Sequence, residues 1–215
     1  MQRSEDWHRM RRDKLTASNV GALLGLCSYT SRSTALRRAR GCDDFRGNDA
    51  TRYGCMMEDE VCKWYEAWSV AKGGERVHHD GFQVHPQYNF MGGSPDGLLG
   101  ERGILEIKCP YNQRWAKLEG NVSLSYYMQC QALLWAYGRE WVHFVMYAGP
   151  LVGASVRKVT VDHDLLHKLL PILTKIHEDV STKRSAPRSI NSKQVKEWVA
   201  QSQLFHTSLV ERDIL

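Results

Sequence analysis

The sequence predicts an α/β (α+β) protein in which helices flank a central mixed β-sheet. Three observations support this prediction. Apolar residues recur at helical spacing over 52–71, and short apolar runs separated by glycine turns follow over 77–109. The rest of the chain has the pattern of a helix, two strands and further helices. A chain of 215 residues is long enough for one domain with a sizeable core. We expect a single domain over 1–215, with a helical N-terminal part (1–75), a sheet core (76–161) and C-terminal helices (162–215).

The helices of the first half are indicated by caps and by periodicity. Thr16 and Ser18 can cap a short helix that Gly25 would end, and residues 33–40 form a second helix with a basic face. The strongest helical pattern spans 52–71, where the apolar residues share one face: Tyr53, Met57, Val61, Trp64 and Trp68. Glu58 follows Met57 by about 100° around this helix, so its carboxylate can face a cleft while the helix stays anchored.

The most informative strand is the apolar run over 103–110, which Pro110 ends. A strand alternates its side chains between two faces, so the run divides into two sets. Leu105, Ile107 and Cys109 fall on one face, and Glu106 and Lys108 on the other. The remaining elements that we expect are a helix over 123–137, strands over 142–147 and 154–161, and helices from residue 162 onward.

Composition excludes several classes of protein. The chain is 42% hydrophobic and 25% charged, which is typical of globular domains rather than disordered or fibrous proteins. It has no apolar run long enough for a membrane span, and its first residues are too polar for a secretory signal. Six cysteines without CxxC spacing indicate neither a zinc knuckle nor a disulfide framework. We therefore expect a soluble intracellular protein with reduced thiols.

Charge is unevenly distributed along the chain. Residues 1–40 hold nine basic and three acidic side chains, residues 41–110 seven and twelve, and residues 111–215 thirteen and nine. Basic surfaces attract phosphate backbones, and clustered carboxylates attract divalent cations. A protein that needs both is one that cuts nucleic acid, although charged faces that are merely solvated could give the same split.

The candidate site joins a turn to a strand. Asp96 lies in the turn Ser94–Gly97, and ten residues later Glu106 and Lys108 project from one side of a strand, about 6.6–6.8 Å apart along it. The glycine-rich segment 97–103 can return Asp96 to the same place. Two carboxylates and the carbonyl of Ile107 are hard oxygen donors that suit Mg²⁺ or Mn²⁺. Lys108 could then position a water molecule or stabilise charge that develops on a phosphate.

Each part also has an ordinary structural explanation. A Pro-Asp-Gly turn is common, and a Glu-x-Lys sequence on an edge strand is usually solvated. However, the residues around Glu106 and Lys108 are apolar enough for a central strand. Charges on a central strand are costly unless they are paired, bind a ligand or face a cleft, so the combination favours a functional site.

These residues resemble a known superfamily. Pro95-Asp96 followed by Glu106-Ile107-Lys108 resembles the signature of the PD-(D/E)xK nucleases, which include restriction endonucleases and many exonucleases. A longer series is similar to the phage lambda exonuclease branch, with its viral and phage alkaline exonucleases: Trp7-His8-x-x-Arg11, Thr16-Ala17-Ser18, Gly54-x-x-x-Glu58, Ser94-Pro95-Asp96-Gly97, Leu105–Pro110 and Tyr127-Met128-Gln129-Cys130-Gln131. The match covers residues 7–135 and implies a restriction-endonuclease-like mixed sheet flanked by helices.

The resemblance implies a role for each matching residue. Asp96, Glu106 and the Ile107 carbonyl would hold the metals, two in each active site, with Lys108 beside the nucleophilic water. Glu58 matches an upstream acidic residue that helps to order the second metal or its water. Gln131 matches a glutamine near the scissile phosphate, although a buried amide satisfied by the backbone is the alternative.

Three further residues match the part of the family that grips a 5′-terminal phosphate. Arg11 and Ser18 match phosphate-binding residues, and Thr16 belongs to the same block. An arginine can bind a phosphate through two hydrogen bonds, and the amides at a helix N-terminus favour an anion. Such a pocket would make the enzyme work from DNA ends.

The function that we expect is a metal-dependent 5′→3′ exonuclease. It would degrade one strand of linear, 5′-phosphorylated double-stranded DNA to mononucleotides and leave a 3′ single strand for recombination or repair. The resemblance further implies a single-strand annealing protein as partner, assembly of three copies into a ring and, for a viral protein, location in the cytoplasm or nucleus of a host cell. Alternatives are a structure- or sequence-specific endonuclease of the same superfamily and a DNA-binding module without catalysis.

Overall fold

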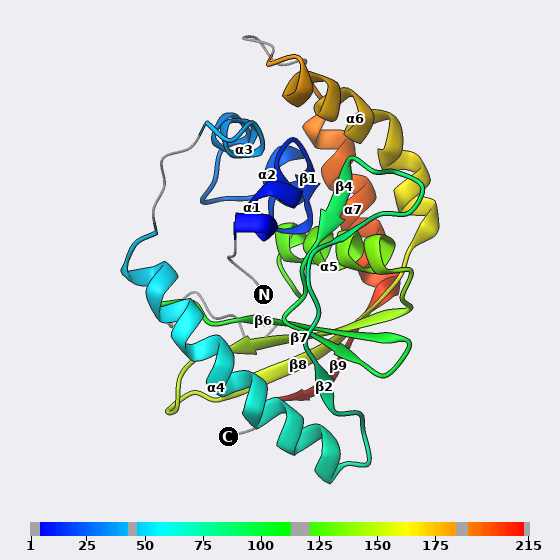
Figure 1. Ribbon diagram of the computed structural model, residues 1–215. Helices are drawn as coiled ribbons and strands as arrows, with labels where there is room; N and C mark the ends of the chain where they lie inside the picture. Colours follow the sequence, from blue (N-terminus) through cyan, green and yellow to red (C-terminus); the bar gives the residue numbers. More distant parts are fainter. Residues whose placement is uncertain (1–4, 43–46, 113–120, 184–188, 213–215) are drawn as a thin grey trace.

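The computed structural model describes residues 5–42, 47–112, 121–183 and 189–212. Figure 1 shows their arrangement in helices and strands. The helices are α1 (Glu5–Arg11), α2 (Ala17–Leu23), α3 (Arg32–Ala39), α4 (Asp49–Ala71), α5 (Leu124–Tyr137), α6 (His163–Ser181) and α7 (Ser192–His206). The strands are β1 (Leu15–Thr16), β2 (Val77–His78), β3 (Gln83–Val84), β4 (Met91–Gly93), β5 (Gly97–Leu99), β6 (Gly103–Lys108), β7 (Trp141–Tyr147), β8 (Ala154–Thr160) and β9 (Thr207–Arg212).

The strands form two sheets, and both are mixed. The larger sheet has the order β2-β5-β6-β7-β8-β9, in which β6 and β7 are parallel and the other neighbours antiparallel. The smaller sheet has the order β1-β4-β3, with β1 parallel to β4. The predicted fold class, a central mixed sheet flanked by helices, is confirmed.

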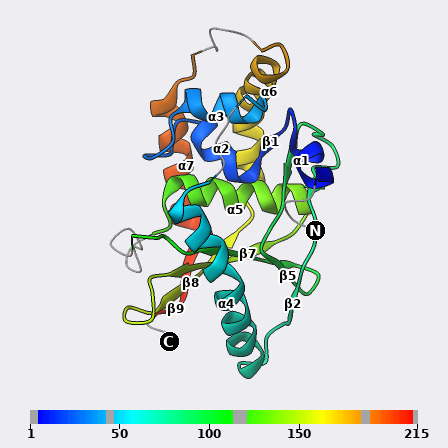
Figure 2. The ribbon, with the colours of Figure 1, turned by 60° about the vertical axis from the view of Figure 1, so that its left-hand side comes forward.

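Helices cover the two faces of the larger sheet unequally. Helix α4 lies across one face, and α5, backed by α2, α6 and α7, lies on the other (Figures 1 and 2). The hydrophobic core is divided accordingly. Leu105 and Ile107 of β6 pack in a smaller cluster with Val61 and Tyr65 of α4, whereas Ile104 belongs to the larger cluster around α5. The alternation expected along this strand is therefore present.

Local sequence explains where several helices begin. The side chain of Asn48 accepts a hydrogen bond from the Thr51 N–H and caps α4, which starts three residues before the predicted range. Thr16 occupies the cap position of α2, but its side chain makes no capping hydrogen bond. Its hydroxyl lies 3.3 Å from Ser18 Oγ instead.

The C-terminal third differs from the prediction. Helices α6 and α7 are present, but residues 207–212 form β9, which pairs with β8 at the edge of the larger sheet. A short strand in which Ser208, Leu209 and Val210 are all exposed has no alternation of buried and exposed residues by which to recognise it. Pairing with β8, rather than local pattern, determines its conformation.

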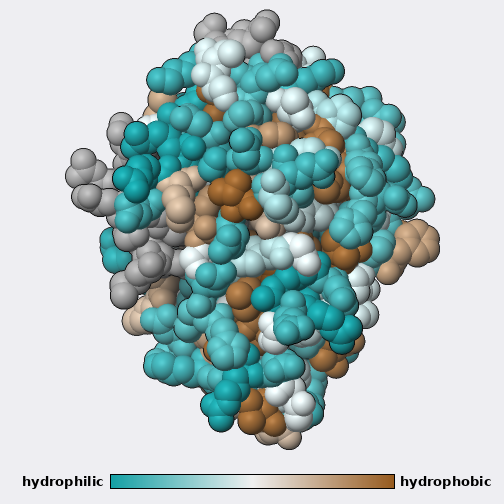
Figure 3. All heavy atoms as spheres, turned by 45° about the vertical axis from the view of Figure 1, so that its right-hand side comes forward, coloured by the Kyte–Doolittle hydropathy of each residue, from teal (hydrophilic) through white to brown (hydrophobic). Residues whose placement is uncertain are grey.

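Both the helices and the surface carry hydrophobic residues within the described ranges. None of the helices there is long and apolar enough to cross a bilayer. On the face shown in Figure 3, hydrophobic residues form small separate patches among hydrophilic ones.

Candidate active site

The turn carrying Asp96 lies against the end of β6, as its spacing predicts. Strand β5 pairs with β6 from Gly97 opposite Leu105 to Leu99 opposite Gly103. Asp96 precedes this pairing, and its Oδ2 accepts a hydrogen bond of 2.6 Å from the Ile107 N–H. The N–H and C=O of one strand residue point to the same edge, so the Ile107 carbonyl also faces the side where Asp96 lies.

A glycine makes this arrangement possible. A Cβ atom at Gly97 would lie 2.3 Å from Cγ1 of Val77, on the neighbouring strand β2. A larger residue would require the Val77 side chain to move, so glycine at this position lets β5 pack closely between β2 and β6. Asp96 is thereby held at the start of β5.

Glu106 and Lys108 lie on the same side of β6 and contact each other. The Lys108 ammonium pairs with Oε1 of Glu106, and the Gln129 amide of α5 donates to the same oxygen. Glu106 is 1% exposed, and its second oxygen, Oε2, is buried with no hydrogen-bond partner. One acceptor in the middle of the cluster is therefore unfilled.

Burial shifts the pKa values of the two carboxyls Asp96 and Glu106 upward. Burial raises the pKa of Asp96, although Lys108 and the Ile107 N–H oppose the shift. Burial, followed by repulsion from Asp96, raises the pKa of Glu106 to about 8. Burial also acts to lower the pKa of Lys108, but the carboxylates of Glu106 and Asp96 outweigh it and raise that pKa. The cluster therefore favours an added positive charge.

Glu58 reaches this cluster from α4. A hydrogen bond between the side chains of Glu58 and Asp96 acts on the pKa of Asp96. Glu58 and Lys108 both line a cavity of about 210 Å³, together with Pro110 and Tyr126. The Lys108 ammonium lies 5.7 Å from the centre of the Tyr126 ring. Glu58, Asp96, Glu106 and Lys108 are thus brought together, and we call these four residues the acid cluster.

Gln131 lies elsewhere, which corrects the sequence prediction. Its amide nitrogen donates to the Tyr127 hydroxyl and the Thr160 carbonyl, and its oxygen accepts from the Asp162 N–H. It is completely buried, in agreement with the alternative of a satisfied structural amide. The glutamine that contacts Glu106 is Gln129, for which the sequence pattern predicts no role in the site.

A second polar cluster, which we call the Arg11 cluster, joins Arg11, Ser18 and Thr16. Arg11 donates to Ser18 Oγ at 3.2 Å, and Ser18 Oγ lies 3.3 Å from Thr16 Oγ1. The Arg11 guanidinium lies 5.6 Å from the centre of the Phe82 ring, a cation–π geometry. Burial lowers the pKa of Arg11 to about 10, so the group stays charged at neutral pH.

Phe82 has space for its ring because of another glycine. A Cβ atom at Gly92 would lie 2.7 Å from Cζ of Phe82. The Tyr137 hydroxyl donates to the Gly81 carbonyl at 2.7 Å and so anchors the preceding residue. Phe82 is thus a fixed surface beneath Arg11, and sequence patterns gave no sign of it.

Comparison with known proteins assigns the family. The YqaJ-like viral recombinase domain matches residues 6–140, which is more than half of the chain. The chain belongs to this family. The matched range contains every residue of the two polar clusters described above. A search of curated proteins returned no match.

The fold also matches solved structures. The alkaline exonuclease LHK-Exo from Laribacter hongkongensis is 23% identical, with a TM-score of 0.70, and the match covers 92% of this chain and 99% of that one. The structure of LHK-Exo in complex with dAMP matches with the same identity and coverage and a TM-score of 0.71. The fold that the resemblance implies, a mixed sheet flanked by helices, is therefore shared with this alkaline exonuclease.

Proposed function

We propose that this protein is a metal-dependent 5′→3′ exonuclease that degrades one strand of linear double-stranded DNA to mononucleotides. The observation that carries the proposal is the unfilled Oε2 of Glu106, buried beside Asp96 and Lys108. The fold shared with an alkaline exonuclease that binds dAMP agrees with a DNA substrate.

The donors of the cluster fit a hard divalent cation. Within the described part of the chain, no three His, Cys, Asp or Glu side chains form a ready-made metal cluster. Mg²⁺, however, keeps several waters and needs only one or two carboxylates, so Asp96, Glu106 and the Ile107 carbonyl would suffice. Glu58 would act on a second ion through water. When bound, Mg²⁺ or Mn²⁺ would polarise the scissile phosphate and lower the pKa of a water molecule.

The protein's own groups would then orient the reaction. Lys108, at the cavity that Glu58 also lines, would hold the attacking water or stabilise negative charge on the phosphate. Gln129 would keep Oε1 of Glu106 turned toward α5 and leave Oε2 toward the metal. We assign this positioning role to Gln129 rather than to Gln131.

End recognition is the proposed role of the second cluster. A guanidinium and two hydroxyls, from Arg11, Ser18 and Thr16, provide the donors that a terminal phosphate needs. Holding the 5′-phosphate there would place the next phosphodiester bond at the acid cluster. Attack by water on that phosphorus, with the 3′-oxygen of the first nucleotide leaving, would free the held nucleotide and leave a new 5′-phosphate on the following one. The remaining 3′ strand would suit a single-strand annealing protein, and a ring of three copies could enclose the DNA.

Nucleotide release from duplex DNA with Mg²⁺ or Mn²⁺ tests the proposal. We expect fast release from 5′-phosphorylated linear DNA, slower release from 5′-hydroxyl DNA, no cutting of closed circles, and loss of all release with Lys108→Ala. Nicking of closed circular DNA would contradict the exonuclease proposal and indicate an endonuclease. DNA binding without any release would indicate a non-catalytic module.

A further inference from the structure

A larger cavity adjoins the small one at the acid cluster. It has a volume of about 520 Å³, and Pro110 and Tyr126 line both cavities. Its other walls include the rings of Tyr29 and Phe144 and the side chain of Arg157. Aromatic walls with one cation suit a ligand that has both a flat ring and an anionic group.

Arg157 belongs to the same sheet face as the acid cluster. Glu106 pairs with Phe144 on β7, and Phe144 pairs with Arg157 on β8, so the three side chains form one row. Two strand spacings separate Glu106 from Arg157, which is about 10 Å. The register against β9 shifts between Val156 and Arg157, an irregularity that can redirect a side chain.

Arg157 is a buried cation at the wall of the cavity. The residue is 5% exposed, and its Nη1 donates to Ser155 Oγ at 2.7 Å. Burial, and then the guanidinium of Arg212, lower the pKa of Arg157. A guanidinium can bind a phosphate through two hydrogen bonds, and Arg157 lies at the wall of the cavity where it could do so.

The cavity and the Arg11 cluster lie on opposite sides of the acid cluster. Helix α2 begins near the later part of α5, because a Cβ atom at Gly93 would contact both Ala17 and Leu133. Further along α2, a Cβ atom at Gly21 would contact Ser125, near the start of α5. Gln129, which contacts Glu106, lies between these two points on α5.

We propose that this cavity binds the nucleotide that follows the scissile phosphate in the degraded strand, with its base against Tyr29 and Tyr126 and its 3′ phosphate at Arg157. The inference rests on the proposed exonuclease function, because the strand would run from Arg11 past Glu106 into the cavity. Stacking on aromatic rings holds any base, so the site would fix the strand without selecting a sequence.

An abasic site at the second nucleotide from a 5′-phosphorylated end tests the assignment. Single-turnover release of the first nucleotide should be slowed about tenfold, the typical effect of losing one stacked base. Tyr29→Ala removes a side chain that is 62% exposed, and should slow release from natural DNA by a similar factor with little further loss on abasic DNA. Phe205→Ala, which removes a 79% exposed ring on α7, should keep the full abasic effect.

Substitutions that remove or keep the positive charge test the role of Arg157. Arg157→Gln should weaken duplex binding, measured by fluorescence anisotropy without metal, and Arg157→Lys should restore part of it. Arg102→Gln, at an exposed arginine in the β5–β6 turn, is the matched control. This binding assay needs no cleavage, so it tests the cavity even if no nucleotide is released.

The outcomes separate the two proposals. Release from natural DNA with no abasic effect, and no effect of Tyr29→Ala, would overturn the cavity assignment and leave the exonuclease intact. If free dAMP binds and Tyr29→Ala abolishes this binding, but the abasic site has no effect, the cavity holds the released product. That result would also overturn the proposed assignment of the cavity. Absence of release, with abasic-sensitive binding retained, would refute the exonuclease and support the strand site.

Discussion

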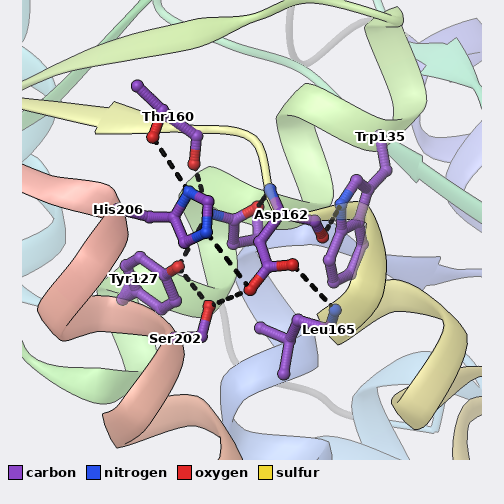
Figure 4. Close-up of polar contacts among 8 residues, drawn as sticks. Tyr127, Trp135, Thr160, Asp162, Leu165, Ser202 and His206 are labelled. Carbon is purple, nitrogen blue, oxygen red and sulfur yellow. Dashed lines mark hydrogen bonds and ion pairs between the residues drawn. The ribbon is translucent and has the colours of Figure 1, made fainter.

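Two carboxylates of this protein, Glu106 and Asp162, lie in regions with opposite properties. Asp162 caps α6 by accepting from the Leu165 N–H at 2.9 Å, and it accepts from Ser202 Oγ at 2.6 Å. Figure 4 shows these contacts converging on it, with His206 Nε2 at 3.6 Å. Glu106, in contrast, has one oxygen without a hydrogen bond. The protein's own donors fill the oxygens of the structural carboxylate Asp162, whereas the carboxylate of the candidate site keeps one buried oxygen without a donor.

The pKa shifts of the two groups follow this difference. Burial acts to raise the pKa of Asp162, but the Ser202 and Leu165 hydrogen bonds and His206 outweigh it and lower that pKa. Burial raises the pKa of Glu106. The Asp162 region connects four elements, because Tyr127 of α5 bonds Ser202 of α7, and His206 contacts Thr160 of β8 beside the start of α6 (Figure 4).

The two glutamines of α5 give the largest expected contrast, since each belongs to one region. Gln129→Ala removes a donor to Glu106 and should reduce the nucleotide release rate by roughly 100-fold, with a smaller effect on stability. Gln131→Ala leaves the Thr160 carbonyl and Asp162 N–H unpaired and should cost about 1–3 kcal/mol of stability. Single-turnover kinetics and thermal unfolding measure the two effects. The reverse pattern would mean that Gln131 is the glutamine that serves the reaction.

Metal binding should depend on pH because of Glu106. A cation needs the ionised carboxyl, and the pKa of this group is about 8 in the metal-free protein. Below that pH a proton competes, so the apparent Mg²⁺ affinity should fall by about tenfold per pH unit from pH 8 to pH 6. Calorimetric Mg²⁺ titrations at several pH values measure this. Asp162→Asn should leave the dependence unchanged, and a constant affinity across this range would contradict the role of Glu106.

Stability without metal should respond to the two carboxyls in opposite directions. In the unfolded state the carboxyl of Glu106 loses its proton near its ordinary pKa of 4.5, whereas in the folded state it keeps the proton up to a pH of about 8. The contribution of this group to the free energy of unfolding therefore falls as the pH rises toward about 8. Glutamine at this position does not ionise, so Glu106→Gln removes this pH-dependent loss of stability. We expect Tm at pH 9 to rise by about 2–4 °C, which corresponds to roughly 1 kcal/mol of unfolding free energy. The pKa of Asp162 is lowered from 3.8, so its contribution is present above this pH and lost in acid.

Asp162→Asn should therefore lower Tm at pH 7, and the gap from the unmodified protein should close in acid. Asparagine can still cap α6, but its amide nitrogen cannot accept from Ser202. Thermal unfolding between pH 3 and pH 9 measures both variants. Equal destabilisation by both substitutions at pH 9 would show that Glu106 is a structural group like Asp162.

The sequence alone was sufficient to predict the acid cluster, because strand alternation and turn geometry determine where its central residues lie. A period of two separates Glu106 from Leu105 and Ile107, and a glycine turn returns Asp96 to the same strand. These rules do not extend to α5, which is buried on nearly every side. Gln129 and Gln131 are both buried, so periodicity cannot tell which one faces Glu106.

Long-range contacts account for the other features that the sequence did not reveal. The Asp162 region depends on contacts between residues up to 75 positions apart, such as Tyr127 and Ser202. Strand β9 exists because β8 offers an edge with which to pair. Neither has a local signal, since each partner alone is an ordinary polar or exposed residue.

The smallest expected effect concerns how the Arg11 cluster holds its guanidinium. The Phe82 ring lies beneath Arg11, and Gly92 leaves room for it. Phe82→Leu keeps an apolar side chain but loses the ring face, so the ratio of release from 5′-phosphorylated and 5′-hydroxyl ends should fall by about 2- to 5-fold. Phe82→Tyr should keep the ratio. Because the comparison is between two ends cut by the same acid cluster, damage to that cluster would lower both rates and leave the ratio unchanged. A ratio that Phe82→Leu does not alter would show that Ser18 and Thr16 hold Arg11 without the ring.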